Sequence, residues 1–171
     1  MAIAQEDGVS AYGVLMYVDF IFKAFFFGYS IAVTPVVGYH YGAQNHAELK
    51  SLLRKSLVIT ALASLLMTGG AIVLAGPIAD LFVGYDAALH DMTVNALRVY
   101  SVSFLVFGFN IFGSAFFTAL NNGLVSALIS FLRTLVFQVA AVIVLPMLFG
   151  IDGIWLSVTV GDGLTCLVAA T

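Results

Sequence analysis

The chain has 171 residues, of which 62% are hydrophobic and only 9% are charged. Soluble domains carry about 45–50% apolar and about 25% charged residues, so this composition excludes a soluble domain and predicts an all-α integral membrane protein. The net charge of −3 comes without a basic patch, which excludes nucleic acid as a partner, and the single cysteine, Cys166, excludes a disulfide framework and a Cys-rich metal site.

Five apolar segments are long enough to cross a bilayer, for which about 20 residues suffice. In chain order they cover residues of about 9–40, 56–75, 95–120, 124–149 and 154–171. The chain begins directly before the first segment and stops inside the last one. We therefore expect it to be part of a longer protein.

The first segment carries an acid and a base one helical turn apart, Asp19 and Lys23. Charges inside a membrane helix are costly and commonly functional, and the i, i+4 spacing places both side chains on one helix face. The segment also contains Pro35 and ends in the Gly-x-x-x-Gly pattern of Gly38 and Gly42. We expect a helix bend at the proline and close helix packing at the two glycines.

The connections after the first two segments differ in charge. Residues 43–55 form a predicted polar loop that contains Lys50, Arg54 and Lys55, half of the six basic residues. Cytoplasmic loops are enriched in Lys and Arg, so this loop is predicted to be cytoplasmic and the N-terminus to lie outside. Gly76-Pro77 is expected to end the second segment, and residues 84–93, which lack Lys and Arg, are expected to form an outer loop.

The last three segments carry further polar residues within predicted membrane helices. They are Asn110, Arg133, Gln138 and Asp162. Tight turns are predicted at residues 121–123 and 150–153, where Asn and Gly gather. At 1.5 Å per residue, Asp19, Arg133 and Asp162 each lie ~12–15 Å from a helix end, close to the membrane midplane.

Two acids and two bases at one depth predict a polar cluster in the interior of the bundle. Transporters bind substrates and coupling ions at this level, so Asp19, Lys23, Arg133 and Asp162 are candidate binding residues. The alternative is a structural network that locks the helices together, and it is the favoured interpretation for Arg133 and Asp162. The amides of Asn110 and Gln138 either line the cavity or form interhelical hydrogen bonds.

Several motifs occur in an order that is typical of one transporter family. They are GVSAYGV at the start of the first segment, Pro35-x-x-Gly38-x-x-x-Gly42-Ala43 at its end, Arg133, Gly150-x-x-Gly153-x-Trp155, and Asp162. With these motifs the chain resembles the C-terminal lobe of multidrug and toxic compound extrusion (MATE) transporters, and most of all their MepA-like bacterial branch. The resemblance implies a multi-pass protein of the bacterial inner (plasma) membrane with two six-helix lobes, of which this chain supplies about the eighth to the twelfth helix.

The resemblance also implies a function, that of a secondary active antiporter for multidrug efflux. Such a protein exports drug-like, often cationic xenobiotics in exchange for protons or sodium ions, and no cofactor other than the coupling ion is expected. Its partners would be membrane lipid, small-molecule substrates, and the missing N-terminal lobe and preceding helix of the same protein. Segment 95–120 contains no Asp or Glu, which speaks against the cation site that some branches hold there.

Two other functions stay open. A flippase for lipid-linked precursors, from the same superfamily, should carry more basic residues in its cavity than Lys23 and Arg133. A truncated membrane protein without transport activity is the third possibility, because five helices alone cannot enclose a two-lobed cavity. An enzyme is not expected, since the sequence offers no nucleophile–base set, no metal-ligand spacing and no phosphate loop.

Overall fold

The computed structural model of the chain describes residues 5–169, which are helical except for short connections. In chain order the elements are α1 (Gln5–Gly42), α2 (His46–Val83), α3 (Ala87–Ser101), α4 (Phe104–Ala119), α5 (Gly123–Phe131), the π-helical turn η1 (Leu132–Phe137), α6 (Gln138–Phe149) and α7 (Ile151–Ala169). Elements α5, η1 and α6 follow one another without interruption and form one long helix.

Four helical stretches within residues 5–169 are long and apolar enough to cross a membrane. They are Asp7–Gly42, His46–Val83, Gly123–Phe149 and Ile151–Val168. Helices α3 and α4 pass the same test only when they are taken together, as a candidate fifth span that bends by 44° at its break. Large apolar side chains such as Phe20 and Leu66, each 76% exposed, cover the outside of the bundle and suit a lipid environment. These observations confirm the predicted all-α membrane fold.

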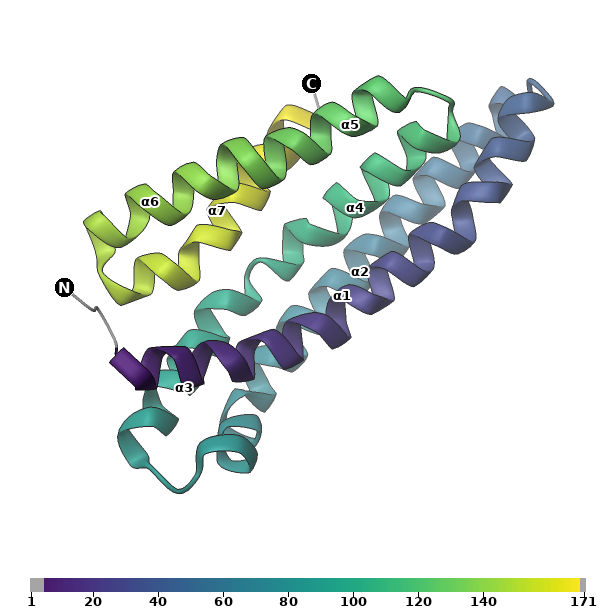
Figure 1. Cartoon of the computed structure of the whole chain (residues 1–171). Helices are drawn as coiled ribbons and strands as arrows, with labels where there is room; N and C mark the ends of the chain where they lie inside the picture. The colour runs from purple at the N-terminus through teal and green to yellow at the C-terminus, as the bar shows by residue number, and fades with distance from the viewer. Residues whose placement is uncertain (1–4, 170–171) are drawn as a thin grey trace.

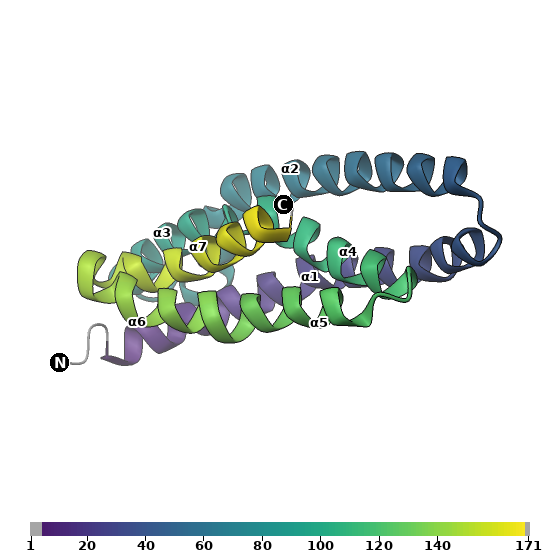
Figure 2. The ribbon, with the colours of Figure 1, turned by 90° about the horizontal axis from the view of Figure 1, so that it is seen from above.

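Helices α1, α2 and α4 run side by side, and α5–α6 and α7 form a hairpin next to α4 (Figure 1). Seen from above, α2 lies along one side of the bundle and α5–α6 along the other (Figure 2). The α1–α2 and α4–α5 turns lie at one end of the bundle, whereas the α2–α3 and α6–α7 connections lie at the opposite end (Figure 1). The chain therefore traverses the bundle in alternating directions.

Helix α2 is much longer than the expected range 56–75, because it runs from His46 to Val83. The side chain of Asn45 caps its start by accepting a 3.2 Å hydrogen bond from the backbone N–H of Glu48. The predicted cytoplasmic loop 43–55 is therefore wrong as a loop, and its basic residues lie on the first turns of the helix. Pro77 does not end the helix, since a membrane helix tolerates proline where neighbouring helices support it.

Three other predictions of element bounds are also wrong. Helix α3 begins at Ala87, eight residues before the expected start at 95, because the Asp86 side chain caps it through the N–H groups of Ala88 and Leu89. The predicted segment 95–120 is not one helix but is broken after Ser101. The predicted turn 150–153 shrinks to Gly150, whose φ of 61° ends α6 and lets α7 begin at the next residue.

The closest packing among α1, α2 and α4 occurs at Gly108. A Cβ atom there would lie within 3 Å of the Phe26 ring and of Thr60 Cγ2. Phe26 and Phe107 are almost completely buried next to this point, with exposed fractions of 2% and 1%. The glycine thus brings three helices together and holds Phe107 in the centre of the bundle.

Candidate functional site

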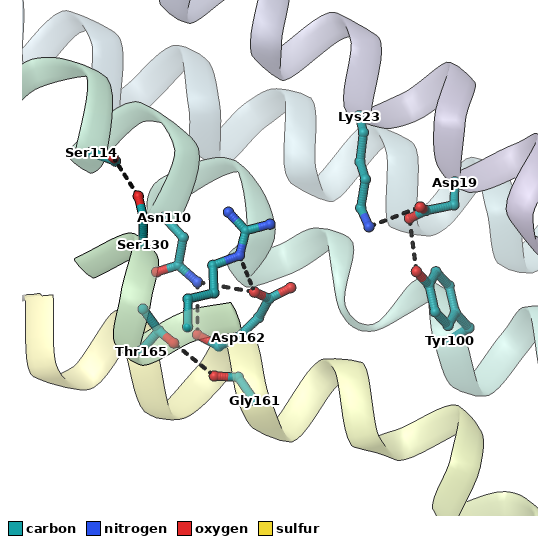
Figure 3. Close-up of polar contacts among 10 residues, drawn as sticks. Asp19, Lys23, Tyr100, Asn110, Ser114, Ser130, Gly161, Asp162 and Thr165 are labelled. Atoms are coloured by element: carbon teal, nitrogen blue, oxygen red, sulfur yellow. Dashed lines mark hydrogen bonds and ion pairs between the residues drawn. The ribbon is translucent and has the colours of Figure 1, made fainter. Parts of the chain in front are cut away.

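The acid and base of α1 form an ion pair, in which Lys23 Nζ lies 2.8 Å from Asp19 Oδ2. The other carboxylate oxygen of Asp19 accepts a 2.8 Å hydrogen bond from the hydroxyl of Tyr100 on α3 (Figure 3). Asp19 is only 6% exposed, and a buried charge is stable only when it is paired and hydrogen-bonded. Both of its oxygens meet that condition.

A second ion pair joins η1 to α7. Arg133 Nε lies 2.9 Å from Asp162 Oδ1, and Asp162 is 2% exposed. Asn110 Nδ2 on α4 donates a 2.8 Å hydrogen bond to the backbone carbonyl oxygen of Asp162 and lies 3.4 Å from its Oδ1 atom (Figure 3). Three helical elements therefore meet at one carboxylate.

The ring of Phe107 connects the two ion pairs. Lys23 Nζ and Arg133 Cζ each lie 4.5 Å from the centre of this ring, a distance at which a cation is attracted to an aromatic face. The structure thus brings Asp19, Lys23, Arg133 and Asp162 together, and we call these four residues the charged cluster. Two acids and two bases give the charged cluster a formal charge of zero.

The position of Arg133 depends on the π-helical turn η1. The backbone N–H of Gln138 bonds the carbonyl oxygen of Arg133, five residues back, instead of four. Such turns are rare and are frequent at functional sites. Helix α7 approaches this region at Gly161, where a Cβ atom would lie 2.9 Å from Gln138 Oε1. Gln138 is therefore placed at the contact between α6 and α7.

The predicted bend and packing residues of α1 lie apart from the charged cluster. Pro35 is exposed and lies within the continuous helix α1. A Cβ atom on Gly38 would lie an ordinary 3.7 Å from the Ala119 carbonyl oxygen, and one on Gly42 would have no neighbour within 4 Å among the described residues. Gly38 thus contacts the end of α4, and the expected packing at Gly42 stays a prediction. Closer approaches between helices occur at Gly108, Gly153 and Gly161.

A cavity of about 420 Å³ lies beside the charged cluster, between α1, α4, α5 and η1. Its polar lining includes Ser30, Asn110, Ser114, Ser130 and Arg133. The hydroxyl oxygens of Ser114 and Ser130 are 3.2 Å apart across the contact of α4 with α5 (Figure 3). This volume falls in the range of about 300–1,000 Å³ that is usual for small-molecule sites.

Sequence reasoning missed Tyr100 and Phe107. The chain contains 7 tyrosines and 15 phenylalanines, and nothing in their spacing distinguishes these two. The signal for Tyr100 is weak: a tyrosine hydroxyl needs a hydrogen-bond partner when it is buried. Phe107 has no sequence signal, because its role follows from the close approach of α1 and α4 at Gly108.

Comparison with known proteins gives one family and several similar structures. The sequence model of the MatE family matches residues 2–151. The fold is similar to the outward-facing conformation of a multidrug resistance MATE family transporter of the MOP superfamily, with a TM-score of 0.89 and 24% identity over 98% of this chain and 38% of that chain. No curated protein matches the chain.

Two further solved structures share this fold. The Vibrio cholerae MATE transporter VcmN in its bent form has a TM-score of 0.87 and 20% identity, covering 95% of this chain and 37% of that chain. A MOP superfamily transporter from Pyrococcus furiosus has a TM-score of 0.86 and 23% identity, covering 96% of this chain and 37% of that chain. The chain therefore spans less than two fifths of the length of these transporters.

Proposed function

The chain belongs to the MatE family of membrane transporters, and we propose that the full-length protein is a secondary active antiporter that exports drug-like, often cationic compounds. The coupling ion is a proton or a sodium ion. This chain supplies the eighth to the twelfth helix, and the missing N-terminal lobe and preceding helix complete the transmembrane cavity. Lipid and the exported small molecules are its other partners.

The observation that carries the proposal is the pairing of Asp19 inside an apolar helix. Its side chain is 8% exposed, and the side chain of its partner Lys23 is 22% exposed. A cationic compound competes with Lys23 for this carboxylate, and a proton or sodium ion competes with the compound. The cationic compound and the coupling ion cannot occupy this carboxylate at the same time. Their binding is therefore mutually exclusive, as antiport requires.

Basic residues at one end of the bundle support an orientation of the protein in the membrane. The first turns of α2 carry Lys50, Arg54 and Lys55, and basic residues near the ends of membrane helices favour the cytoplasmic side. The end that holds the α1–α2 and α4–α5 turns then faces the cytoplasm. The N-terminal end of α1 faces outward, in the inner membrane of a bacterium.

The flippase alternative has less support from the charges. Lys23 and Arg133 are each paired with an acid, so the charged cluster offers no net positive charge to a lipid-linked pyrophosphate.

The alternative of a truncated protein without transport activity is tested by reconstituting the 171-residue chain alone. Robust exchange of drug for cation by this chain alone would contradict that alternative, because the chain would then transport without the rest of the protein.

The central experiment replaces Asp19 by Asn in the full-length protein. Purified transporter in proteoliposomes is given a proton gradient or a sodium gradient, and export of a cationic dye such as ethidium is followed by fluorescence. We expect Asp19→Asn to abolish ion-coupled export. The matched control is Asp7→Asn, at an exposed position on the same helix. Unchanged export and unchanged ion coupling in Asp19→Asn would remove this carboxylate from the mechanism.

A further inference from the structure

The first turns of helix α2 carry a basic ridge on their outer face. Lys50, Arg54 and Val58 follow one another at intervals of four residues, which places them in one row along the helix. An open groove runs along each side of this row. The far walls of the grooves are formed by Ser51, Lys55 and Ile59 on one side and by Leu53, Leu57 and Ala61 on the other. We call the row together with Lys55 the α2 ridge.

The α2 ridge points away from the rest of the bundle. The buried row of this part of α2 is made of Ser56, Thr60 and Ser64, each at most 2% exposed. Because successive residues of a helix turn by about 100°, the row of Lys50, Arg54 and Val58 lies on the opposite side. Helix α2 itself lies along one side of the bundle (Figure 2). The α2 ridge therefore faces the surroundings of the described helices.

The bases of the α2 ridge have no acidic partner within residues 5–169. Neither Lys50, Arg54 nor Lys55 takes part in an ion pair there. Glu48 is the only acid among residues 24–79, and it lines neither groove. Residues 113–131, which include the α4–α5 turn at the same end of the bundle (Figure 1), carry no charge. This end thus has an excess of positive charge, which attracts anions.

The apolar surface that follows the bases indicates a lipid as the anion. From residue 56 to residue 79, α2 has no charged side chain. Leu62, Leu65 and Leu66 on this stretch are 56%, 61% and 76% exposed. A soluble anion gains nothing from such a surface, whereas a phospholipid joins a phosphate to acyl chains. Basic clusters directly next to a membrane-spanning segment are typical of sites for anionic lipids.

We propose that the α2 ridge binds the headgroup of an anionic phospholipid. Lys50, Arg54 and Lys55 contact its phosphate, and its acyl chains follow the grooves along the apolar part of α2. A zwitterionic phospholipid is disfavoured, because it carries a cation of its own beside the phosphate. The bound lipid fixes the first turns of α2 at the level of the headgroups. This inference does not depend on the proposed transport function, since it needs only that α2 spans the membrane.

A matched pair of lipids tests the proposal. Dioleoyl phosphatidylglycerol and dioleoyl phosphatidylcholine have the same acyl chains, and only the former has a net negative charge. Binding of single lipid molecules to the purified full-length protein in neutral detergent is measured by native mass spectrometry. We expect phosphatidylglycerol to bind more tightly, by about fivefold for each base that its phosphate contacts. Equal affinities for the two lipids would overturn the proposal.

The central variant is Arg54→Gln, because Arg54 lines both grooves and is exposed. We expect the affinity for phosphatidylglycerol to fall by about fivefold and that for phosphatidylcholine to stay unchanged. The matched control is Arg98→Gln, which removes an exposed arginine of α3 that lines neither groove and should leave both affinities unchanged. Equal losses in the two variants would mean that the lipid responds to net charge alone, and the assignment to the α2 ridge would fail.

A fluorescent label next to the α2 ridge reports which lipid lies there. Leu62 continues the row of Lys50, Arg54 and Val58, so Leu62→Cys is labelled with bimane in a protein whose other cysteines are replaced by serine. The labelled protein is placed in phosphatidylcholine vesicles with a small fraction of nitroxide-labelled phosphatidylglycerol or nitroxide-labelled phosphatidylcholine. We expect stronger quenching by the labelled phosphatidylglycerol, and we expect Arg54→Gln to remove the difference.

The control label lies at the opposite end of the same helix. Leu81 is 79% exposed and far from the basic residues along α2, so a bimane on Leu81→Cys should be quenched equally by the two lipids. Equal quenching of the label at Leu62 would overturn the proposal.

Other occupants of the α2 ridge give different results. If an acidic segment of the missing N-terminal lobe covers the ridge, Arg54→Gln lowers the melting temperature in lipid-free detergent and leaves the affinities for both lipids unchanged. If a water-soluble phosphate compound occupies it, glycerol phosphate displaces phosphatidylglycerol at concentrations similar to those of the lipid itself. Either result overturns the proposal.

Discussion

Tyr100 and Asp19 are 81 residues apart in the sequence, yet the tyrosine hydroxyl donates a 2.8 Å hydrogen bond to the aspartate carboxylate. Tyr100 lies in the last turn of α3, directly before the 44° bend that separates α3 from α4. The bond therefore ties the bend to the charged part of α1. The same carboxylate contacts both Lys23 and Tyr100, each through a different oxygen.

Tyr100→Phe should destabilise the protein and weaken the pairing of Asp19. Loss of a hydrogen bond to a buried charged group costs about 1.5–3 kcal/mol of unfolding free energy. Thermal unfolding of the purified protein in detergent measures the effect. Tyr85→Phe serves as the control, because Tyr85 is 82% exposed and its hydroxyl should contribute little. Equal melting temperatures of the two variants would contradict a stabilising role for the bond.

Gly108→Ala should disrupt the contact of α1, α2 and α4. The new methyl group meets the Phe26 ring and Thr60 Cγ2 within 3 Å, and overpacking of this kind typically costs about 1–3 kcal/mol. The matched control lies five residues further along the same helix: a Cβ atom on Gly113 has no described neighbour within 4 Å. We expect Gly113→Ala to unfold at the wild-type temperature or slightly above it, because alanine favours a helix.

Removal of one partner of the Arg133–Asp162 ion pair should cost more than removal of both. Arg133→Gln leaves the buried charge of Asp162 unpaired, and Asp162→Asn leaves the charge of the partly buried Arg133 unpaired. Loss of one partner of a buried pair typically costs about 3–5 kcal/mol, whereas loss of both charges often costs far less. A double-mutant cycle on unfolding free energies measures the difference. Additive effects of the two substitutions would mean that the 2.9 Å contact contributes no coupling energy.

Asp86→Ala should destabilise the start of α3. The Asp86 side chain accepts hydrogen bonds from two backbone N–H groups, those of Ala88 and Leu89, and loss of such a cap costs about 1 kcal/mol. Amide hydrogen exchange should accelerate in the first turn of α3 and stay unchanged in α4. Faster exchange throughout the chain would indicate a global effect instead of a local one.

The sequence contains enough information to predict the membrane spans and the Asp19–Lys23 contact. Apolar segments longer than about 20 residues cannot remain in water, and a spacing of four residues places two side chains on one face of any helix. The rise of 1.5 Å per residue also predicts that Arg133 and Asp162 lie at the level of this pair. These features depend on local periodicity and on helix length alone.

Helix ends and the contacts of Tyr100 and Phe107 could not be predicted in the same way. The charges of the polar stretches 43–55 and 84–93 favour loops, but the caps Asn45 and Asp86 start α2 and α3 within them, so that residues 46–55 and 87–93 are helical. The break after Ser101 lies in an apolar run without proline or glycine at the break itself. The break positions Tyr100 next to Asp19, and the close approach of helices at Gly108 positions Phe107 next to Lys23 and Arg133. Both features depend on how several helices pack together.

The π-helical turn η1 accommodates one extra residue between Arg133 and Gln138, since the N–H of Gln138 bonds the carbonyl oxygen five residues back. Loss of one residue there would restore ordinary bonding over four residues, and the same side of α6 would still face α7. Loss of one residue within the regular part of α6 would instead rotate the rest of that helix by ~100°. A one-residue gap inside 132–137 in an alignment of related chains is therefore compatible with unchanged packing of α6 on α7, whereas the same gap later in α6 changes the side that packs.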